Sequence, residues 1–165
     1  MKQLLSLFLV LLFANAKAQP PAGDGAVEPV KWTVSAKPDG NAWVLSFVAD
    51  IEHGWAVYST NNYGDMGPWP TSVKVDSVAG RTLVGAINET GSQVIQGLDI
   101  NFDMEVKKFK QQAIFTQRIT VDDPNTPVTG MFEYMTCNDE MCLPPATVYF
   151  IVPGLNSGTF ELGSM

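Results

Sequence analysis

The sequence is poor in the residues that most often carry catalysis or bind metals. Its 165 residues include two cysteines and a single histidine, His53. Zinc is usually held by four ligands, and a nucleophilic cysteine needs a nearby base. Two thiols and one imidazole far away in the sequence fit neither kind of site well. We therefore expect His53 to be a turn residue between strands, and we expect no metal site.

Long apolar runs and helical patterns are also scarce. The apolar run from Leu4 to Phe13 is shorter than the ~20 residues of a membrane-spanning helix, and no later stretch approaches that length. The sequence has no amphipathic helical run, no internal repeat and no glycine-rich phosphate loop. We expect a mature chain that is not inserted in a membrane and that uses no organic cofactor.

The first residues have the pattern of a secretory signal. Lys2 precedes the apolar run, which is followed by small residues up to Ala18. We predict a signal peptide over residues 1–18, a flexible leader rich in proline, glycine and alanine over 19–29, one folded domain over 30–153 and a small polar tail over 154–165. The protein is thus expected to be exported, to a compartment that permits disulfides.

The charge balance is acidic. The chain has 10 lysines and arginines against 17 aspartates and glutamates, and loss of Lys2 and Lys17 with the signal changes the formal net charge from −7 to −9. An acidic protein is a poor partner for nucleic acid or for an anionic membrane surface. We expect neither as a ligand.

Alternation of apolar and polar residues predicts strands along the whole domain. The first pair forms a hairpin around a turn at 38–40, with apolar residues on one face at Trp32, Val34, Ala36, Trp43, Leu45, Phe47, Ala49 and Ile51. Further strands are expected at 55–58, 72–78, 81–87, 104–109, 113–121, 130–136 and 146–152, with a turn at 88–91 and a loop near Gly97. About eight or nine short strands favour an all-β fold, an antiparallel sandwich of immunoglobulin-like architecture.

Both cysteines lie in one loop between the last two predicted strands. Cys137 and Cys142 are separated by four residues, close enough to form a disulfide. A structural bond closing so small a loop would stabilise the fold by roughly 2 kcal/mol, against about 3 for a 15-residue loop. This difference does not decide between a structural and a redox-active disulfide.

Thiol–disulfide exchange needs two thiols that can pair and a loop that a partner can reach. Cys137 and Cys142 meet this requirement. No basic residue or helix start lies beside them in the sequence, and Asp139 and Glu140 would raise a thiol pKa. Such a pair should react slowly with small thiols and well only when docked to a partner protein.

The stretch from Tyr134 to Pro145, with the strand that follows it, resembles the redox loop of the N-terminal periplasmic domain of the thiol:disulfide interchange protein DsbD. The resemblance extends to the stretches 50–59 and 102–121 and so covers most of residues 30–152. It implies an immunoglobulin-like sandwich in the periplasm, with secretion from the cell as the alternative. The spacing of the two cysteines is one residue shorter than in the best-known members.

The resemblance also implies roles for individual residues. Cys137 and Cys142 would be the redox pair of a thiol–disulfide oxidoreductase, with Cys142 forming the mixed disulfide with a partner. The partners would be thioredoxin-like exported proteins and a membrane or soluble electron donor, all supplied in trans. Phe102, preceded by Asp99, would belong to a cap loop that shields the pair; the alternative for Phe102 is an ordinary core aromatic.

A second functional class stays open. The loop from Tyr63 to Trp69 is rich in aromatic residues, glycine and proline. In this interpretation the protein is a non-catalytic exported sandwich that binds a protein or another ligand through this loop, and the disulfide is only a structural bond.

Overall fold

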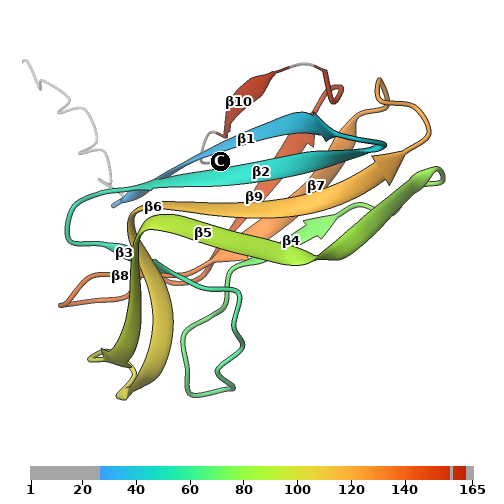
Figure 1. Ribbon diagram of the computed structural model, residues 1–165. Coiled ribbons are helices and arrows are strands. Elements are labelled where there is room, and N and C mark those ends of the chain that lie inside the picture. The colour runs from blue at the N-terminus through green and yellow to red at the C-terminus, as the bar shows by residue number, and fades with distance from the viewer. Residues whose placement is uncertain (1–26, 157, 163–165) are drawn as a thin grey trace, which may run out of the picture.

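The computed structural model describes residues 27–156 and 158–162, so the predicted signal peptide and most of the predicted leader lie outside the described residues (Figure 1). The described part contains ten strands and no helix, and hence no helix that could cross a membrane. The strands are β1 (Val30–Asp39), β2 (Ala42–Ile51), β3 (Ala56–Tyr58), β4 (Ser72–Val75), β5 (Arg81–Asp99), β6 (Met104–Val121), β7 (Val128–Tyr134), β8 (Thr136–Cys137), β9 (Ala146–Val152) and β10 (Thr159–Leu162).

The strands form two antiparallel sheets that pack face to face. The larger sheet has the order β10-β1-β2-β6-β3-β8, with β5 on β6, and the smaller has the order β4-β7-β9. Aromatic rings fill the space between them: Trp32 lies 4.5 Å from Phe132 and Phe47 lies 4.9 Å from Phe150, measured between ring centroids. This architecture confirms the predicted immunoglobulin-like antiparallel sandwich.

The hairpin of β1 and β2 follows the predicted alternation. Trp32 pairs with Ala49 and Val34 with Phe47, and all four side chains are buried. Because successive residues of a strand point to opposite faces, the apolar positions of both strands meet the core together. Gly40 in the turn has a φ of +62°, a conformation that glycine adopts without strain.

The predicted division of residues 81–121 into short strands separated by a turn and a loop is wrong. The expected turn at 88–91 and the expected loop near Gly97 both lie within β5, and the two strands expected at 104–109 and 113–121 are one strand, β6. β5 is an edge strand paired only with β6, so polar residues and glycines are tolerated in it. Register shifts between Val84 and Asn88 and between Gly91 and Gln93 absorb the irregular residues as bulges.

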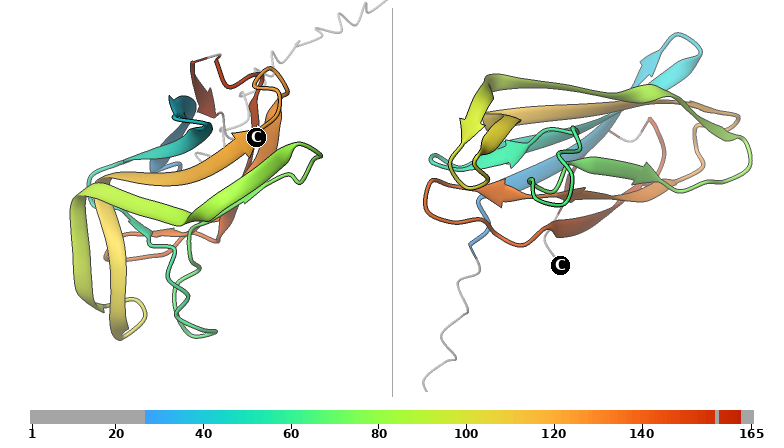
Figure 2. Two further views of the ribbon diagram at one scale, coloured as in Figure 1. Left: turned by 45° about the vertical axis from the view of Figure 1, so that its right-hand side comes forward. Right: turned by 90° about the horizontal axis from the view of Figure 1, so that it is seen from below.

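The long hairpin of β5 and β6 bends sharply, as Figure 2 shows. On one side of the bend β6 pairs with β2, and on the other it pairs with β3. Gln111 has a φ of +66° at this point, and Gly91 packs closely against Phe109. We call the part beyond the bend, residues 93–110, the distal arm. It carries the turn that contains Phe102.

The C-terminal stretch is also part of the fold. β10 pairs with β1, with Trp32 opposite Leu162, and Leu155 is buried. The sequence predicts a small polar tail over residues 154–165, but backbone pairing with the free edge of β1 makes residues 159–162 a strand.

We expect Gly91→Ala to destabilise the fold and Gly97→Ala, on the same strand, to leave it unchanged. A Cβ atom at Gly91 would lie 2.6 Å from Phe109 Cδ1 and 2.7 Å from the carbonyl oxygen of Gln112, whereas one at Gly97 would meet nothing within 4 Å. Overpacking against a buried ring and a backbone carbonyl should lower the free energy of unfolding by about 1–3 kcal/mol. Urea unfolding of the two oxidised variants measures the difference. Equal stabilities would show that this close approach does not set the bend.

Candidate functional site

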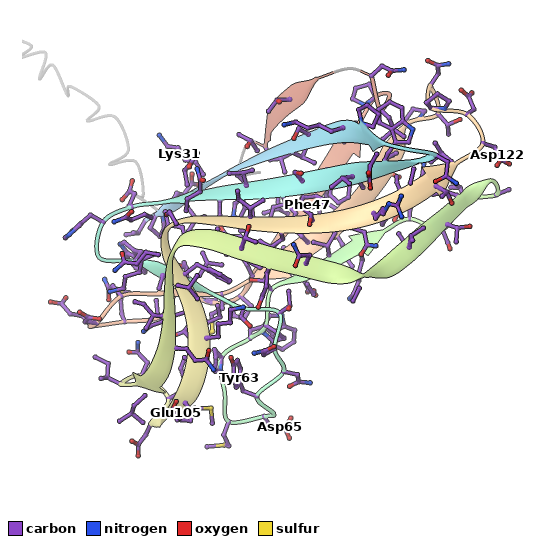
Figure 3. All side chains as sticks on the ribbon, in the orientation of Figure 1. Lys31, Phe47, Tyr63, Asp65, Glu105 and Asp122 are labelled. Carbon is purple, nitrogen blue, oxygen red and sulfur yellow. A yellow bond between two sulfur atoms is a disulfide. The ribbon has the colours of Figure 1, made fainter. Side chains whose placement is uncertain are left out.

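Three connecting segments meet at one end of the molecule: residues 59–71 between β3 and β4, residues 100–103 between β5 and β6, and residues 138–145 between β8 and β9 (Figure 1). Asn101 Nδ2 donates to the carbonyl oxygen of Asn138 at 3.0 Å, which joins the second segment to the third. The backbone N–H of Lys107 donates to Tyr63 Oη at 2.7 Å, which joins the first segment to the distal arm. Figure 3 shows Tyr63, Asp65 and Glu105 at this end and Asp122 at the opposite end.

Cys137 and Cys142 form a disulfide at this end, with their Cα atoms 4.0 Å apart. β8 places Cys137 opposite Ala56 of β3, and Thr136 Oγ1 donates to the carbonyl oxygen of Ala56 at 2.8 Å. Cys137 is only 2% exposed, whereas Cys142 is partly exposed. A partner that approaches from solvent therefore meets Cys142 first.

Asn138 organises the loop that the disulfide closes. Its backbone N–H donates to the carbonyl oxygen of Met141 at 2.9 Å. Its side-chain Oδ1 accepts from the backbone N–H groups of Glu140 at 2.9 Å and Met141 at 2.7 Å. An asparagine that accepts from the backbone two and three residues ahead holds a tight turn. This turn keeps the two cysteines directly opposite each other.

Phe102 packs into the same small hydrophobic cluster as the two cysteines. The cluster is built on the buried residues Tyr58, Val106 and Cys137, and it is separate from the large core between the sheets. Phe102 meets the Tyr58 ring edge to face, at 5.6 Å between centroids and 89° between planes. The structure thus brings Phe102 and the cysteines together, outside the main core. Its action as a cap remains a prediction.

Asp99 lies beneath this cluster and is fully buried. Its carboxylate accepts from Tyr58 Oη at 3.0 Å, from Lys108 Nζ at 2.7 Å and from the backbone N–H of Asn101 at 2.9 Å. The backbone N–H of Asp103 donates to the carbonyl oxygen of Asp99 at 2.8 Å. Asp99 therefore holds both ends of the turn that carries Phe102.

Burial and these bonds act in opposite directions on Asp99. Burial alone would raise the pKa of this carboxyl, but the hydrogen bond and charge of Lys108, with the bonds from Asn101 and Tyr58, outweigh it and hold the pKa below its usual value. Burial, the charge of Asp99 and the bond to it together raise the pKa of Tyr58. At neutral pH Asp99 is thus an ionised carboxylate that accepts a hydrogen bond from a protonated phenol.

A second ion pair fixes the segment 59–71. Glu89 Oε2 accepts from the backbone N–H of Thr60 at 2.8 Å, and Glu89 Oε1 lies 2.9 Å from Lys107 Nζ. Burial raises the pKa of Glu89, but these interactions outweigh that effect and the pKa is lowered. Lys107 and Lys108 are therefore both engaged with carboxylates near the disulfide.

Cys137, Cys142, Phe102 and Asp99 are the site residues predicted from the sequence, and the structure adds two partners, Tyr58 and Asn138. Nothing in the sequence shows that Tyr58 bonds to a residue 41 positions away. Asn138 could have been found, since an asparagine at the start of a polar turn commonly accepts from the backbone ahead of it.

His53 lies in an exposed turn between β2 and β3, where it was expected. Among the described residues, no group of three or more histidine, cysteine, aspartate or glutamate side chains is placed to hold a metal ion. The chemistry that this end can support rests on its sulfur pair.

No protein-family model and no curated protein matches this sequence. Solved structures do match the fold. The N-terminal domain of DsbD from Neisseria meningitidis, crystallised in its reduced form, superposes with a TM-score of 0.58 at 17% sequence identity, over 82% of this chain and 91% of that one. The N-terminal periplasmic domain of ScsB from Proteus mirabilis gives a TM-score of 0.54 at 12% identity, over 86% of this chain but about half (51%) of that one. The resemblance to the DsbD N-terminal domain is thus confirmed for the fold.

We expect Asp99→Asn to lower the stability of the protein at neutral pH. The difference in stability from the wild-type protein should disappear in acid. The substitution leaves Lys108 beside a neutral amide, which should lower the free energy of unfolding by about 2 kcal/mol. Because the pKa of Asp99 is lowered in the folded protein, its contribution is complete above the ordinary aspartate pKa of about 3.9 and disappears as the pH falls through the lower folded value. Urea unfolding of both proteins between neutral and strongly acidic pH follows the difference.

Asp103→Asn is the matched control, because Asp103 is an exposed carboxylate in the same turn. Its φ of +51° is one that asparagine also tolerates. We expect this control to change stability by no more than about 0.5 kcal/mol. A stability loss for Asp99→Asn that does not change with pH would contradict the account of the carboxylate given above.

Proposed function

We propose that this protein is an exported, periplasmic thiol–disulfide exchange module that passes electrons between a membrane or soluble donor and thioredoxin-like exported proteins through Cys137 and Cys142. The observation that carries the proposal is the disulfide at one end of the sandwich, with Cys142 partly exposed and Cys137 buried. The fold shared with the DsbD N-terminal domain supports it.

The proposed reaction uses the two sulfurs in turn. In the reduced protein the Cys142 thiolate attacks a disulfide of the acceptor, which forms a mixed disulfide and releases one acceptor thiol. The Cys137 thiolate then attacks the sulfur of Cys142 and releases the second acceptor thiol. Two electrons and two protons leave the protein's dithiol, and the disulfide seen in the structure is restored.

The surroundings of the pair favour large partners over small thiols. Phe102 and Cys142 pack against the same small cluster, and Asp139 and Glu140 in the loop are exposed. The carboxylates disfavour a nearby thiolate, and the ring restricts access to the sulfur. We propose that Phe102 acts as the cap and that Asp99, through the turn it holds, positions it. A docked protein can then displace the ring, whereas the contact of a small thiol yields too little binding free energy to do so.

The competing function is a binding module in which the disulfide is a structural bond. A redox titration separates the two: structural disulfides in secreted proteins typically have reduction potentials below about −300 mV, whereas exchanging ones are less reducing. We expect a potential above this value. We also expect Cys137→Ser/Cys142→Ser to keep the fold, with a loss of at most about 2 kcal/mol in the free energy of unfolding. A potential well below that limit, with no exchange with protein disulfides, favours the structural bond.

We expect Cys137→Ser to trap a covalent complex with an exported thioredoxin-like protein that retains only its attacking cysteine, supplied as an activated mixed disulfide. Cys142, left free in this variant, is the more exposed sulfur. Cys142→Ser is the matched control and should trap much less, because Cys137 is 2% exposed. Non-reducing electrophoresis and mass spectrometry of the adducts measure both. Failure of Cys137→Ser to trap any of several such proteins would count heavily against the proposed function, and equal trapping would overturn the role of Cys142.

A further inference from the structure

A pocket of about 410 Å³ opens beside Trp69 in the segment between β3 and β4. Trp69 is 48% exposed, whereas Trp32 and Trp55 are 4% and 8% exposed. Two carboxylate residues, Asp65 and Glu133, also line the pocket. The pocket thus combines an indole ring with two carboxylates.

The backbone around Trp69 is held in place. The N–H of Trp69 donates to Met135 Sδ at 3.4 Å, and that of Gly67 donates to the carbonyl oxygen of Gly64 at 3.2 Å. After the tryptophan, Thr71 Oγ1 donates to the carbonyl oxygen of Tyr58 at 2.6 Å. The segment therefore presents the exposed indole from a fixed backbone, which limits the entropy lost when a ligand binds.

The pocket fits a cation. The indole is the aromatic ring that attracts ammonium and guanidinium groups most strongly. Glu133 Oε2 lies 3.6 Å from Lys74 Nζ, and the lysine side chain is 62% exposed, so this ion pair is loose and open to exchange. The segments 59–71 and 138–145 contain no lysine or arginine, so Lys74 of β4 is the basic side chain that a partner's cation would replace at Glu133.

Met135 connects Trp69, which lines the pocket, to the cluster that contains the disulfide. Met135, the acceptor of the Trp69 N–H, packs in the hydrophobic cluster that contains Cys137 and Cys142. It precedes Cys137 by two residues, which places their Cα atoms within about 7 Å of each other. A protein docked on the sulfur pair can reach the pocket with a side chain near its own cysteine.

We propose that this pocket is a subsite for a lysine or arginine side chain of the protein that exchanges its disulfide with Cys137 and Cys142. The identity of the occupant rests on the proposed function, but the affinity of the pocket for a basic side chain does not. Trp69 supplies the face on which the cation lies, and Asp65 and Glu133 supply the opposite charge.

The binding step is tested without any thiol chemistry. The oxidised protein is titrated with acetyl-lysine methylamide and, as the matched neutral ligand, acetyl-norleucine methylamide, while the indole N–H resonance of Trp69 is followed by NMR. Trp69→Leu assigns this resonance. We expect the lysine compound to shift it in a saturable way and to bind several-fold more tightly than the norleucine compound. Asp65→Asn/Glu133→Gln should remove the preference, whereas Asp122→Asn at the opposite end should keep it. Equal responses to the two compounds, or none, would overturn the subsite.

The exchange step is tested with two disulfide-linked peptide dimers that differ only in carrying lysine or norleucine on both sides of a single cysteine. We expect the reduced protein to reduce the lysine dimer about threefold to tenfold faster at low salt, in the range of a cation–π contact assisted by charge. In Trp69→Leu the two rates should agree within twofold, while Trp69→Phe should keep part of the preference. Thermal melting verifies that each variant is folded.

The outcomes separate the two proposals. Equal reduction of both dimers by the wild-type protein would overturn the subsite and leave the exchange function standing. Reduction of neither dimer, together with no trapped protein complex, would overturn the exchange function. The NMR titration would then still decide whether the pocket binds a basic side chain.

Discussion

The buried carboxylate of Asp99 is the constraint on which the disulfide end depends. It bonds to Tyr58 of β3, to Lys108 of β6 and to Asn101 in the turn between β5 and β6. Removing a carboxylate from water costs several kcal/mol, which only well-formed hydrogen bonds and a counter-charge offset. Displacing the arm would carry Lys108 along with Asp99 but would break the bond from Tyr58 of β3, so the position of the arm against β3 admits little variation. Phe102 lies in the cluster of the cysteines because Asp99 fixes the turn that carries it.

The disulfide end is separate from the main core, so the fold does not depend on the disulfide. The disulfide belongs to a small cluster with Tyr58, Val106 and Phe102, while the aromatic core between the sheets is a different cluster. A bond that closes so short a loop contributes only about 2 kcal/mol by restricting the unfolded chain. Opening it therefore removes little of what holds the sandwich together. A domain with this division can keep its fold in both the oxidised and the reduced state.

The sequence predicts the strands that pack on the core, but it does not predict the edge strand or the long-range contacts. β1 and β2 were predictable because each has one face against the core, which imposes a period of two on residues such as Val34 and Phe47. β5 was not predictable, because an edge strand with bulges is held extended by its hydrogen bonds to β6 and its own residues show no regular alternation. The cysteine pair was evident because there are no other thiols. The bond from Tyr58 to Asp99 joins residues 41 positions apart, and only the bend of the hairpin brings them together.

Under the proposed function, the charges around the disulfide would make its reactivity depend on a partner. Lys107 and Lys108 of the distal arm are both engaged in ion pairs, with Glu89 and Asp99. Asp139 and Glu140 are exposed in the cysteine loop itself. Under the proposed function, a Cys142 thiolate would therefore form beside uncompensated negative charge, and a cation must come from outside to stabilise it. A basic side chain seated against Trp69 would supply that charge only when a suitable protein is docked, which makes recognition and activation the same event.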